Sequence, residues 1–367
     1  MAEVVEINSP EELAGVRMAW NALLPQTPHA SFFHTYDWLR LFWKHYGGER
    51  RLRVLVVRSC GETVGIVPLC VQRERHHFGE VRVLTYPLNA WGTWYGPISR
   101  NPAGSLMLAM EHVRRTPRDW DLIDLRWTPE AGDDRGRTEH AMRLAGLEPH
   151  TEQDERTSVI ALEGVTWESY LASRSPKCRH EIRRQRRALE KDAGVVFARC
   201  RPAGAAEGDG EACPELFRQC VELSRRSWQG RVTNGNTLCH ASVTRFLADC
   251  HLVAGRLGML DICRLSIGDQ PAAFSYNYHY HGAVFAMRMG YDPRVTRHGS
   301  GAVLLGMMIE DSIARGDRLI DLGIGEYGFK KRLRTAAIGG RRVSCYPAGA
   351  WRAQAVRLTQ WLRRRRA

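Results

Sequence analysis

The sequence has no pair of cysteines in the CxxC spacing that zinc sites and redox motifs use, although it contains ten cysteines. The two Cys-His doublets, at Cys239-His240 and Cys250-His251, are separated by a distance that fits no common zinc site. We therefore expect no metal ion. The scattered cysteines are more consistent with buried thiols in a reducing cytosol than with disulfides.

A long apolar segment is also missing. Residues 1–12 are acidic and lack the apolar core of a secretory signal, and no uncharged run approaches the length of a membrane span. We therefore expect a cytoplasmic protein. Its charge is one-sided, with a net value of +13 and a pI near 9.5, which favours an anionic partner. A phosphorylated cofactor, a nucleic acid and an anionic membrane surface all remain open.

The 367 residues, 44% of them hydrophobic, can form two domains of ordinary size or one large domain. Hydrophobic periodicity and turn residues predict the same succession of elements twice. The first half should contain a strand, a helix starting at Ser9-Pro10, a helix over 31–46, a hairpin over 52–58 and 63–72, a strand over 81–84, a helix over 102–114 and a strand over 122–125.

The second half should contain helices over 165–171, 176–191, 214–226 and 243–254, strands over 195–197, 261–267, 271–280 and 283–290, a helix over 302–316 and a strand over 318–324. Leu122-Ile-Asp-Leu125 near the end of the first series resembles Leu319-Ile-Asp-Leu322 near the end of the second. We infer a diverged duplication of an α+β lobe, with lobes at 1–160 and 161–348 and a basic tail at 349–367.

The clearest indication of a ligand is a strand, a glycine turn and a helix near the C-terminus. The strand at 283–290 is followed by Arg297-His-Gly-Ser-Gly301 and then by a helix from Ala302. A helix that starts in a glycine turn offers free N–H groups and a positive dipole end, both suited to a pyrophosphate. The plainer alternative is that Gly299 and Gly301 only start the helix.

This order of elements resembles the GNAT acyltransferase fold, whose phosphate signature is Q/R-x-x-G-x-G/A. Both glycines match at Gly299 and Gly301, whereas Thr296 replaces the usual Gln or Arg. The chain is more narrowly similar to FemAB-like double-GNAT proteins, in particular to the cellulose-biosynthesis CelD-like acetyltransferases. The stretches that carry this likeness are Phe32-Phe-His-Thr-Tyr-Asp-Trp38, Ser175-Pro-Lys-Cys-Arg179 with Arg183-Arg184, Gly290-Tyr-Asp-Pro293, and Asp321-Leu-Gly-Ile-Gly-Glu-Tyr-Gly-Phe-Lys330. Phe329 stands where the family usually has Tyr.

The resemblance implies two tandem GNAT-like lobes and transfer of an acetyl or other acyl group from acyl-CoA to an amine. The acceptor would be a small molecule or a glycan, in polysaccharide or cell-envelope metabolism. The pyrophosphate would lie on the N–H groups around Arg297, His298, Gly299, Ser300, Gly301 and Ala302, and the pantetheine along the strand that holds Met287 and Met289. The candidates for proton transfer are Asp292, Asp321, Glu326, Tyr291 and Tyr327. Asp321 is as consistent with a structural carboxylate, and the Lys330 ammonium could hold an anionic substrate.

Two further segments are candidates for substrate binding. The helix at 176–191 carries Lys177, Arg179 and Arg183, which form either a solvated face or a site for a phosphate, RNA or an anionic acceptor. Trp91 and Tyr95 lie in a loop that does not need such bulk, so they could wall an acceptor site. The arginines at 363–366 suggest a disordered tail or peripheral contact with a membrane surface.

Two other functions stay open. The basic helix and the net charge suit an aminoacyl-tRNA-dependent ligase of the FemAB type. The departures at Thr296 and Phe329 would also suit a non-catalytic scaffold in polysaccharide export. The GxGxxG match at Gly323 to Gly328 is not read as a nucleotide site, because too little chain follows it for the βαβ domain that such a site needs.

Overall fold

The computed structural model describes residues 2–89, 91–130, 134, 136–191, 194–208, 210–295, 299–325 and 327–366. The chain divides into two units, Met1–Glu155 with Ile338–Ala367, and Arg156–Ala337. The sequence prediction places the first boundary at residue 160. It also assigns residues 338–348 to the second lobe, whereas their contacts place them in unit 1.

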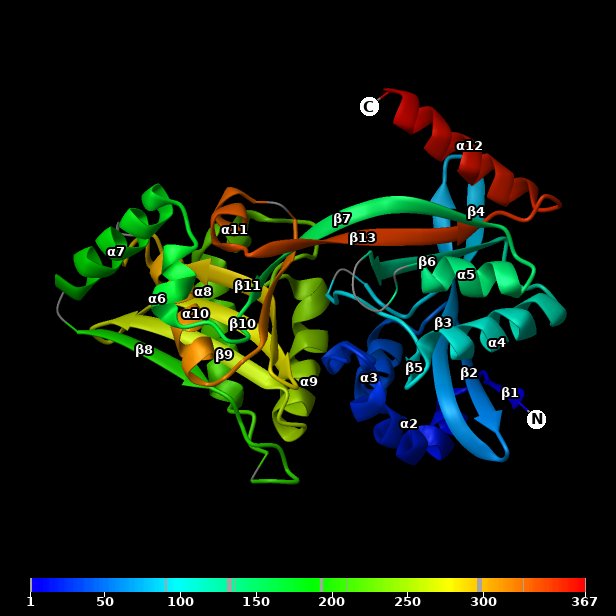
Figure 1. Cartoon of the computed structure of the whole chain (residues 1–367), viewed down its shortest axis with the longest axis horizontal. Coiled ribbons are helices and arrows are strands. Elements are labelled where there is room, and N and C mark those ends of the chain that lie inside the picture. Colours follow the sequence, from blue (N-terminus) through cyan, green and yellow to red (C-terminus); the bar gives the residue numbers. More distant parts are fainter. Residues whose placement is uncertain are drawn as a thin grey trace. The chain divides into compact units, whose positions relative to one another are not determined.

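Unit 1 is a mixed sheet with helices packed on it (Figure 1). Its strands follow the order β1-β2-β3-β4-β6-β13, and a short strand, β5, pairs with β3. The elements are β1 Ala2–Ile7, α1 Pro10–Leu13, α2 Arg17–Leu23, α3 Tyr36–Tyr46, β2 Arg51–Ser59, β3 Glu62–His76, β4 Gly79–Thr85, β5 Ile98–Ser99, α4 Pro102–Arg115, β6 Leu122–Pro129, α5 Arg137–Leu144, β13 Ala336–Cys345 and α12 Trp351–Arg366.

Local sequence signals explain the start of unit 1. The hydroxyl of Ser9 accepts a hydrogen bond from the Glu12 N–H at 3.3 Å and Pro10 opens α1, which confirms the predicted helix start. The predicted hairpin forms between β2 and β3, with Ser59 opposite Glu62. The helix expected over 31–46 is instead a 3₁₀ turn at Phe32–His34 followed by α3, because Thr35 is extended and its hydroxyl caps α3 through the Trp38 N–H.

His34, the last residue of this turn, is a buried histidine. Its Nδ1 lies 3.0 Å from the Ser31 hydroxyl and its ring stacks on Tyr95 with ring centroids 5.2 Å apart. Burial, together with the smaller effect of the nearby charge of His29, lowers the pKa of His34 to about 4. The folded unit therefore contains His34 with a neutral ring.

We expect unit 1 to lose stability as the pH falls from 6.5 to about 4. In that window the unfolded chain protonates His34 and the folded chain does not, so acid favours unfolding. The loss should reach roughly 3 kcal/mol at the acidic end. Urea unfolding of the wild type and of His34→Gln at pH 7 and pH 5 measures it, with the exposed His77→Gln as control. Equal pH dependence in all three proteins would contradict the assignment.

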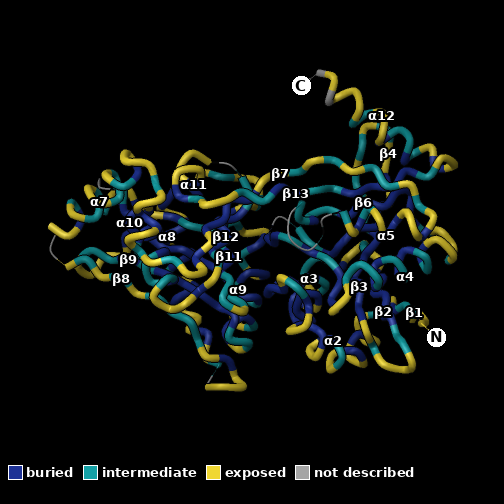
Figure 2. Tube along the Cα trace, viewed as in Figure 1, coloured by how far each residue is buried: buried dark blue, intermediate teal, exposed yellow. Residues whose placement is uncertain are grey.

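In unit 2, which contains β7 from Arg156 onward, the strands follow the order β7-β12-β11-β10-β9-β8. Figure 2 shows its central strands largely buried, and their burial patterns agree. The elements are β7 Pro149–Ala161, α6 Trp167–Ala172, α7 Pro176–Lys191, β8 Val195–Cys200, α8 Pro214–Arg226, α9 Ala241–Arg256, β9 Leu260–Ile267, β10 Gln270–Tyr280, β11 Ala283–Tyr291, α10 Ser300–Ala314, β12 Leu319–Ile324 and α11 Gly328–Leu333.

Successive side chains of β10 point to opposite faces of the sheet, so the helices that they contact can be assigned to one face or the other. Ala273 packs in one core with the helices α6, α7, α10 and α11. Tyr276, an odd number of residues further along the strand, contacts Phe217 of α8 with ring centroids 5.9 Å apart. The helix α10 therefore lies on the same face as α6, α7 and α11, in one core with Val284 of β11 and Ile320 of β12.

The two units repeat one topology, as the duplication predicts. In unit 1 an antiparallel meander of β2, β3 and β4 leads through α4 to β6, which pairs parallel to β4. In unit 2 the meander of β9, β10 and β11 leads through α10 to β12, parallel to β11. The tandem α+β fold expected from the sequence is confirmed.

The strands β7 and β13 were not predicted from the sequence. β7 pairs antiparallel with β12, and β13, from the end of the chain, pairs antiparallel with β6. The last strand predicted from the sequence is the one over 318–324, so β13 was missed, because its small and basic residues (Ala336, Gly339, Gly340 and Arg341) hide the alternation. The expected disordered tail is the helix α12 over the residues that the structure describes.

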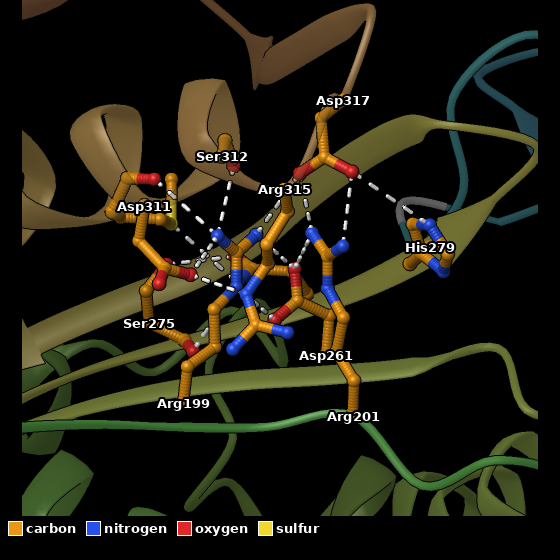
Figure 3. A network of polar contacts seen from close by, with 11 residues as sticks. Arg199, Arg201, Asp261, Ser275, His279, Asp311, Ser312, Arg315 and Asp317 are labelled. Atoms are coloured by element: carbon orange, nitrogen blue, oxygen red, sulfur yellow. Dashed lines mark hydrogen bonds and ion pairs between the residues drawn. The ribbon is translucent and has the colours of Figure 1, made fainter.

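A buried ionic network ties α10 to the sheet of unit 2 (Figure 3). Arg199 of β8 binds both carboxylate oxygens of Asp261 in β9, at 2.9 and 2.7 Å, and reaches Asp311 and Ser312 in the last turn of α10 at 2.9 Å each. Arg201 binds Asp317 in the turn before β12. The side chains of Arg199 and Asp261 are 1% and 0% exposed, so each charge depends on its partner.

Arg199→Lys should lower the unfolding free energy of unit 2 by about 2 kcal/mol. A lysine cannot make the planar two-point contact to Asp261 and reach the end of α10 at once, so a buried carboxylate loses donors. Urea denaturation measures the loss. Arg73→Lys, in an exposed pair with Glu80, is the control and should change stability by less than about 0.5 kcal/mol. A wild-type midpoint for Arg199→Lys would show that the network is dispensable.

Candidate active site

The strands β11 and β12 are paired only at their beginnings. Their parallel register covers residues 283–285 opposite 319–321. The last close approach is at Gly323, where a Cβ atom would lie 2.9 Å from the Ala286 carbonyl oxygen. On its other side β11 stays paired with β10 up to Tyr291, and Met287 is an extra residue in that register. The second half of β11 thus has one edge that β12 does not cover.

The helix α10 begins at the end of β11. Gly299 is its N-cap in the left-handed region, at φ 70°, and accepts hydrogen bonds from the N–H groups of Ala302 and Val303. A Cβ on Gly301 would lie 3.1 Å from the Tyr291 ring. The Ser300 hydroxyl is buried and has no hydrogen-bond partner among the residues described. The predicted cofactor residues Arg297 and His298 lie outside the described residues, as does Thr296.

Three of the predicted residues meet where β12 leaves β11. Asp321 is 2% exposed and accepts a hydrogen bond from the Gly323 N–H at 2.7 Å. Lys330 Nζ donates to the carbonyls of Gly323 and Ile324 at 2.9 and 2.7 Å and lies 5.3 Å from the centroid of the Tyr327 ring. Asp321 and Lys330 thus hold the bulged end of β12, while Tyr327, 64% exposed, faces solvent beside it.

The other proton-transfer candidates lie at the end of β11 or outside the described chain. Tyr291 is exposed and its ring lies against Gly301. Asp292 is buried, and both of its oxygens bind Arg294. The hydrogen bonds and charge of Arg294 lower the pKa of Asp292, so this carboxylate is held ionised within a turn. Glu326 is outside the described residues.

Several residues near the same strand were not predicted. Arg288 of β11 donates to the Asn236 carbonyl at 2.8 Å and the Met287 carbonyl at 2.6 Å, and burial lowers the pKa of Arg288 to about 10. Gln185 of α7 lies against Gly299, with its Nε2 3.0 Å from where a Cβ would be. A charged residue inside an apolar strand is a signal that could have singled out Arg288, whereas nothing in the sequence distinguishes Gln185.

The basic helix α7 forms a pocket of ≈ 450 Å³ with α6. Its lining includes the predicted residues Arg179 and Arg183 together with Arg186, Trp167 and Leu171. Arg179 donates to the carbonyls of Ala172 and Arg174 at the end of α6, while Arg183 and the third predicted residue of this helix, Lys177, are exposed. The pocket thus combines an apolar floor with guanidinium groups.

The remaining predicted substrate residues belong to unit 1. Trp91 and Tyr95 are 2% and 3% exposed, so both are mainly core residues. Tyr95 also lines a small pocket of unit 1 with His34, Trp94 and Arg137. Within the described ranges, no three His, Cys, Asp or Glu side chains are grouped so that they could hold a metal ion.

The family model of the acetyltransferase (GNAT) domain matches residues 176–331. No protein with a curated description matches the chain in sequence. Among solved structures, FemX is similar with a TM-score of 0.57 at 10% identity over 92% of this chain and 96% of that one. L-PGS from Bacillus licheniformis gives 0.56 at 13% identity over 95% and 96%, and a conserved protein of unknown function from Bacteroides thetaiotaomicron gives 0.57 at 12% identity over 94% and 100%.

These likenesses extend over both units, and at such low identity they show a shared fold. The residues matched by the family model include β11, α10 and β12, which form the site described above. They also include all of α7, the helix that contacts Gly299 and lines the pocket.

Proposed function

We propose that this acyltransferase, whose second unit contains a GNAT domain, transfers an acyl group from acyl-CoA to the amine of a small molecule or glycan. The observation that carries the proposal is the separation of β11 from β12 after three paired residues, which leaves the second half of β11 uncovered by β12 as far as Tyr291, beside the start of α10. An extended ligand arm can pair with the free strand edge while its anionic end meets the helix N-terminus.

The N-terminus of α10 fits a diphosphate on two counts. The Ser300 hydroxyl is buried and has no partner among the described residues, so it can donate a hydrogen bond to a phosphate oxygen. Gly301 adds no side chain over the first turn of the helix, whose first N–H groups lack acceptors within the helix. Gly299, Ser300, Gly301 and Ala302 would therefore hold the diphosphate, and Met287 and Met289 would flank the pantetheine arm.

When bound, acyl-CoA supplies the thioester carbon that the amine attacks. The chain must take a proton from the amine and return one to the departing thiolate. We assign the second task to Tyr327, because it is exposed beside the end of β12 and a Cβ on Gly325 would lie 2.9 Å from its ring. Lys330 holds the Gly323 and Ile324 carbonyls and so fixes the backbone that positions this tyrosine.

The acceptor is proposed to bind through the pocket between α6 and α7. Arg179 is committed to the end of α6 and shapes the wall, whereas the exposed guanidinium of Arg183 is available for an anionic group. An amine on a sugar or small molecule with a carboxylate or phosphate fits this combination. Polysaccharide or cell-envelope metabolism, as in CelD-like proteins, would supply such acceptors.

Calorimetric titration with acetyl-CoA, longer acyl-CoAs and CoA tests the donor. We expect one of the acyl-CoAs to bind with a Kd in the micromolar range, and thiol release to follow when amino sugars are added. Absence of binding to every acyl-CoA would refute the proposal. Binding without thiol release in any acceptor screen would favour the scaffold role.

A second donor, aminoacyl-tRNA, is favoured by the exposed cations of α7. Lys177, Arg183, Arg184 and Arg187 are all exposed along this helix. Filter binding with tRNA between about 50 and about 200 mM salt distinguishes the donors, because contacts to several phosphates give a steep salt dependence. No binding to tRNA at low salt would eliminate the ligase.

A further inference from the structure

The C-terminal helix α12 has two apolar faces, and only one is covered. Ala353 and Val356 are buried in a core with Val81 and Val83 of β4 and Leu122 of β6. Gln360 continues this inner face and accepts a hydrogen bond from the Tyr346 hydroxyl at 2.6 Å. One side of α12 is therefore docked on the sheet of unit 1.

The opposite side of α12 carries exposed apolar side chains. Trp351, Leu358 and Leu362 are spaced seven and four residues apart, which places them on one stripe, and Trp361 lies beside it. Their exposed fractions are 61%, 56%, 42% and 46%. Figures 1 and 2 show this helix at the edge of unit 1 with exposed residues along it.

The hairpin between β3 and β4 extends the apolar stripe. The Phe78 ring at its tip lies 6.3 Å from the Trp351 ring, centroid to centroid, and His76 stacks on Phe78. We name the surface formed by Phe78, Trp351, Leu358, Trp361 and Leu362 the α12 face. It is too continuous to be a set of isolated exposed side chains.

The positive charge on and around α12 indicates which kind of partner the α12 face fits. After Glu326 the sequence has twelve Lys and Arg residues and no acid, against a net charge of +13 for the whole chain. On α12 itself Arg357, Arg363 and Arg365 are exposed, and the Arg365 guanidinium lies 3.9 Å from the centroid of the Trp361 ring. Tryptophan and leucine flanked by arginine suit the boundary between lipid headgroups and acyl chains.

We propose that the α12 face docks unit 1 onto an anionic membrane surface. Tryptophan and leucine side chains enter the headgroup layer while the arginines bind lipid phosphates. The contact is peripheral, since none of the helices described is long and apolar enough to span a bilayer. A second copy fits this face less well, because symmetric pairing would bring two acid-free, arginine-rich helices together.

Co-sedimentation of the full chain with vesicles tests the docking. We expect binding to phosphatidylcholine vesicles that contain about 30% phosphatidylglycerol, weak binding to pure phosphatidylcholine, and release in high salt. Leu358→Ala with Trp361→Ala should weaken partitioning roughly 50-fold. The matched control, Leu144→Ala with Trp228→Ala, removes equally exposed residues elsewhere (61% and 54%) and should leave partitioning unchanged.

A second pair of double variants tests the contribution of the arginines to vesicle binding. Arg363→Gln with Arg365→Gln should weaken binding about thirtyfold at low salt, whereas Arg40→Gln with Arg100→Gln, at exposed positions of the same unit, should change it less than about twofold. Light scattering tests whether a second copy of the chain, instead of a membrane, covers the α12 face. A dimer that Trp361→Ala dissociates, equal binding to neutral vesicles, or no vesicle binding by the folded wild type would each overturn the proposal.

Discussion

Tyr327→Phe should lower kcat for acyl transfer about 10³-fold while leaving the Kd of acyl-CoA within about threefold of the wild type. The substitution removes one oxygen from an exposed ring at the place where β12 leaves β11. The ring contacts, with Phe329 at 6.4 Å and with the Lys330 ammonium at 5.3 Å, do not need the hydroxyl. The loss therefore reports the proton that the phenol supplies to the thiolate, as measured by thiol release under saturating substrates.

Tyr291→Phe is the matched control for this effect. Tyr291 is also exposed and also follows a strand of the site, but its ring lies against Gly301 at the start of α10. We expect less than about a threefold change in kcat, since the diphosphate end of the site handles no proton. If the two variants exchange these results, Tyr291 is the proton donor. If both retain activity, neither tyrosine is, and Glu326 becomes the next candidate.

Gly301→Glu should weaken acyl-CoA binding by about 10³-fold. The new Cβ would lie 3.1 Å from the Tyr291 ring, and the carboxylate would stand among the N–H groups that are proposed to bind the diphosphate. Two like charges about 4 Å apart at a protein surface repel by about 4 kcal/mol, which corresponds to a factor near 10³. Calorimetry with the acyl-CoA that binds the wild type measures the change.

Two further variants of α10 test whether the loss of acyl-CoA affinity arises at the start of this helix. Ala314→Glu places the same charge at the exposed opposite end of α10 and should leave acyl-CoA affinity within about twofold. Ser300→Ala removes the buried hydroxyl and should cost about tenfold in affinity without lowering the melting temperature. Tight binding by Gly301→Glu, with a wild-type melting curve, would show that the diphosphate does not lie at this helix start.

The parts of the fold that local sequence patterns encode were predicted well. The predicted meander over 261–290 corresponds to β9, β10 and β11, because glycine turns bound each strand and the strands pair with their neighbours in sequence. The helix predicted from Ala302 begins at Ser300, within the usual uncertainty of a helix boundary. The glycine turn itself identified the candidate diphosphate site.

Long-range relations escaped the sequence analysis. No local signal shows that β12 leaves β11 after Asp321, because that depends on Gly323 bulging at φ 77° and on Lys330 binding the carbonyls behind it. Lys330 was therefore predicted to hold a substrate, although in the structure its ammonium is engaged with backbone. Asp292 has the residue type of a base, and only its contacts with Arg294 reveal the turn that it stabilises.

The way in which strands are exchanged between the two halves of the sequence limits how the chain can be divided. The strand that pairs with β6 of unit 1 is β13, which follows unit 2 in the sequence, and the strand that pairs with β12 of unit 2 is β7, which begins within unit 1. A fragment cut near residue 160 would carry a strand that belongs to the other unit and would lack its own. Either unit expressed without the strand that is supplied from elsewhere in the sequence should therefore leave an open β edge prone to aggregation.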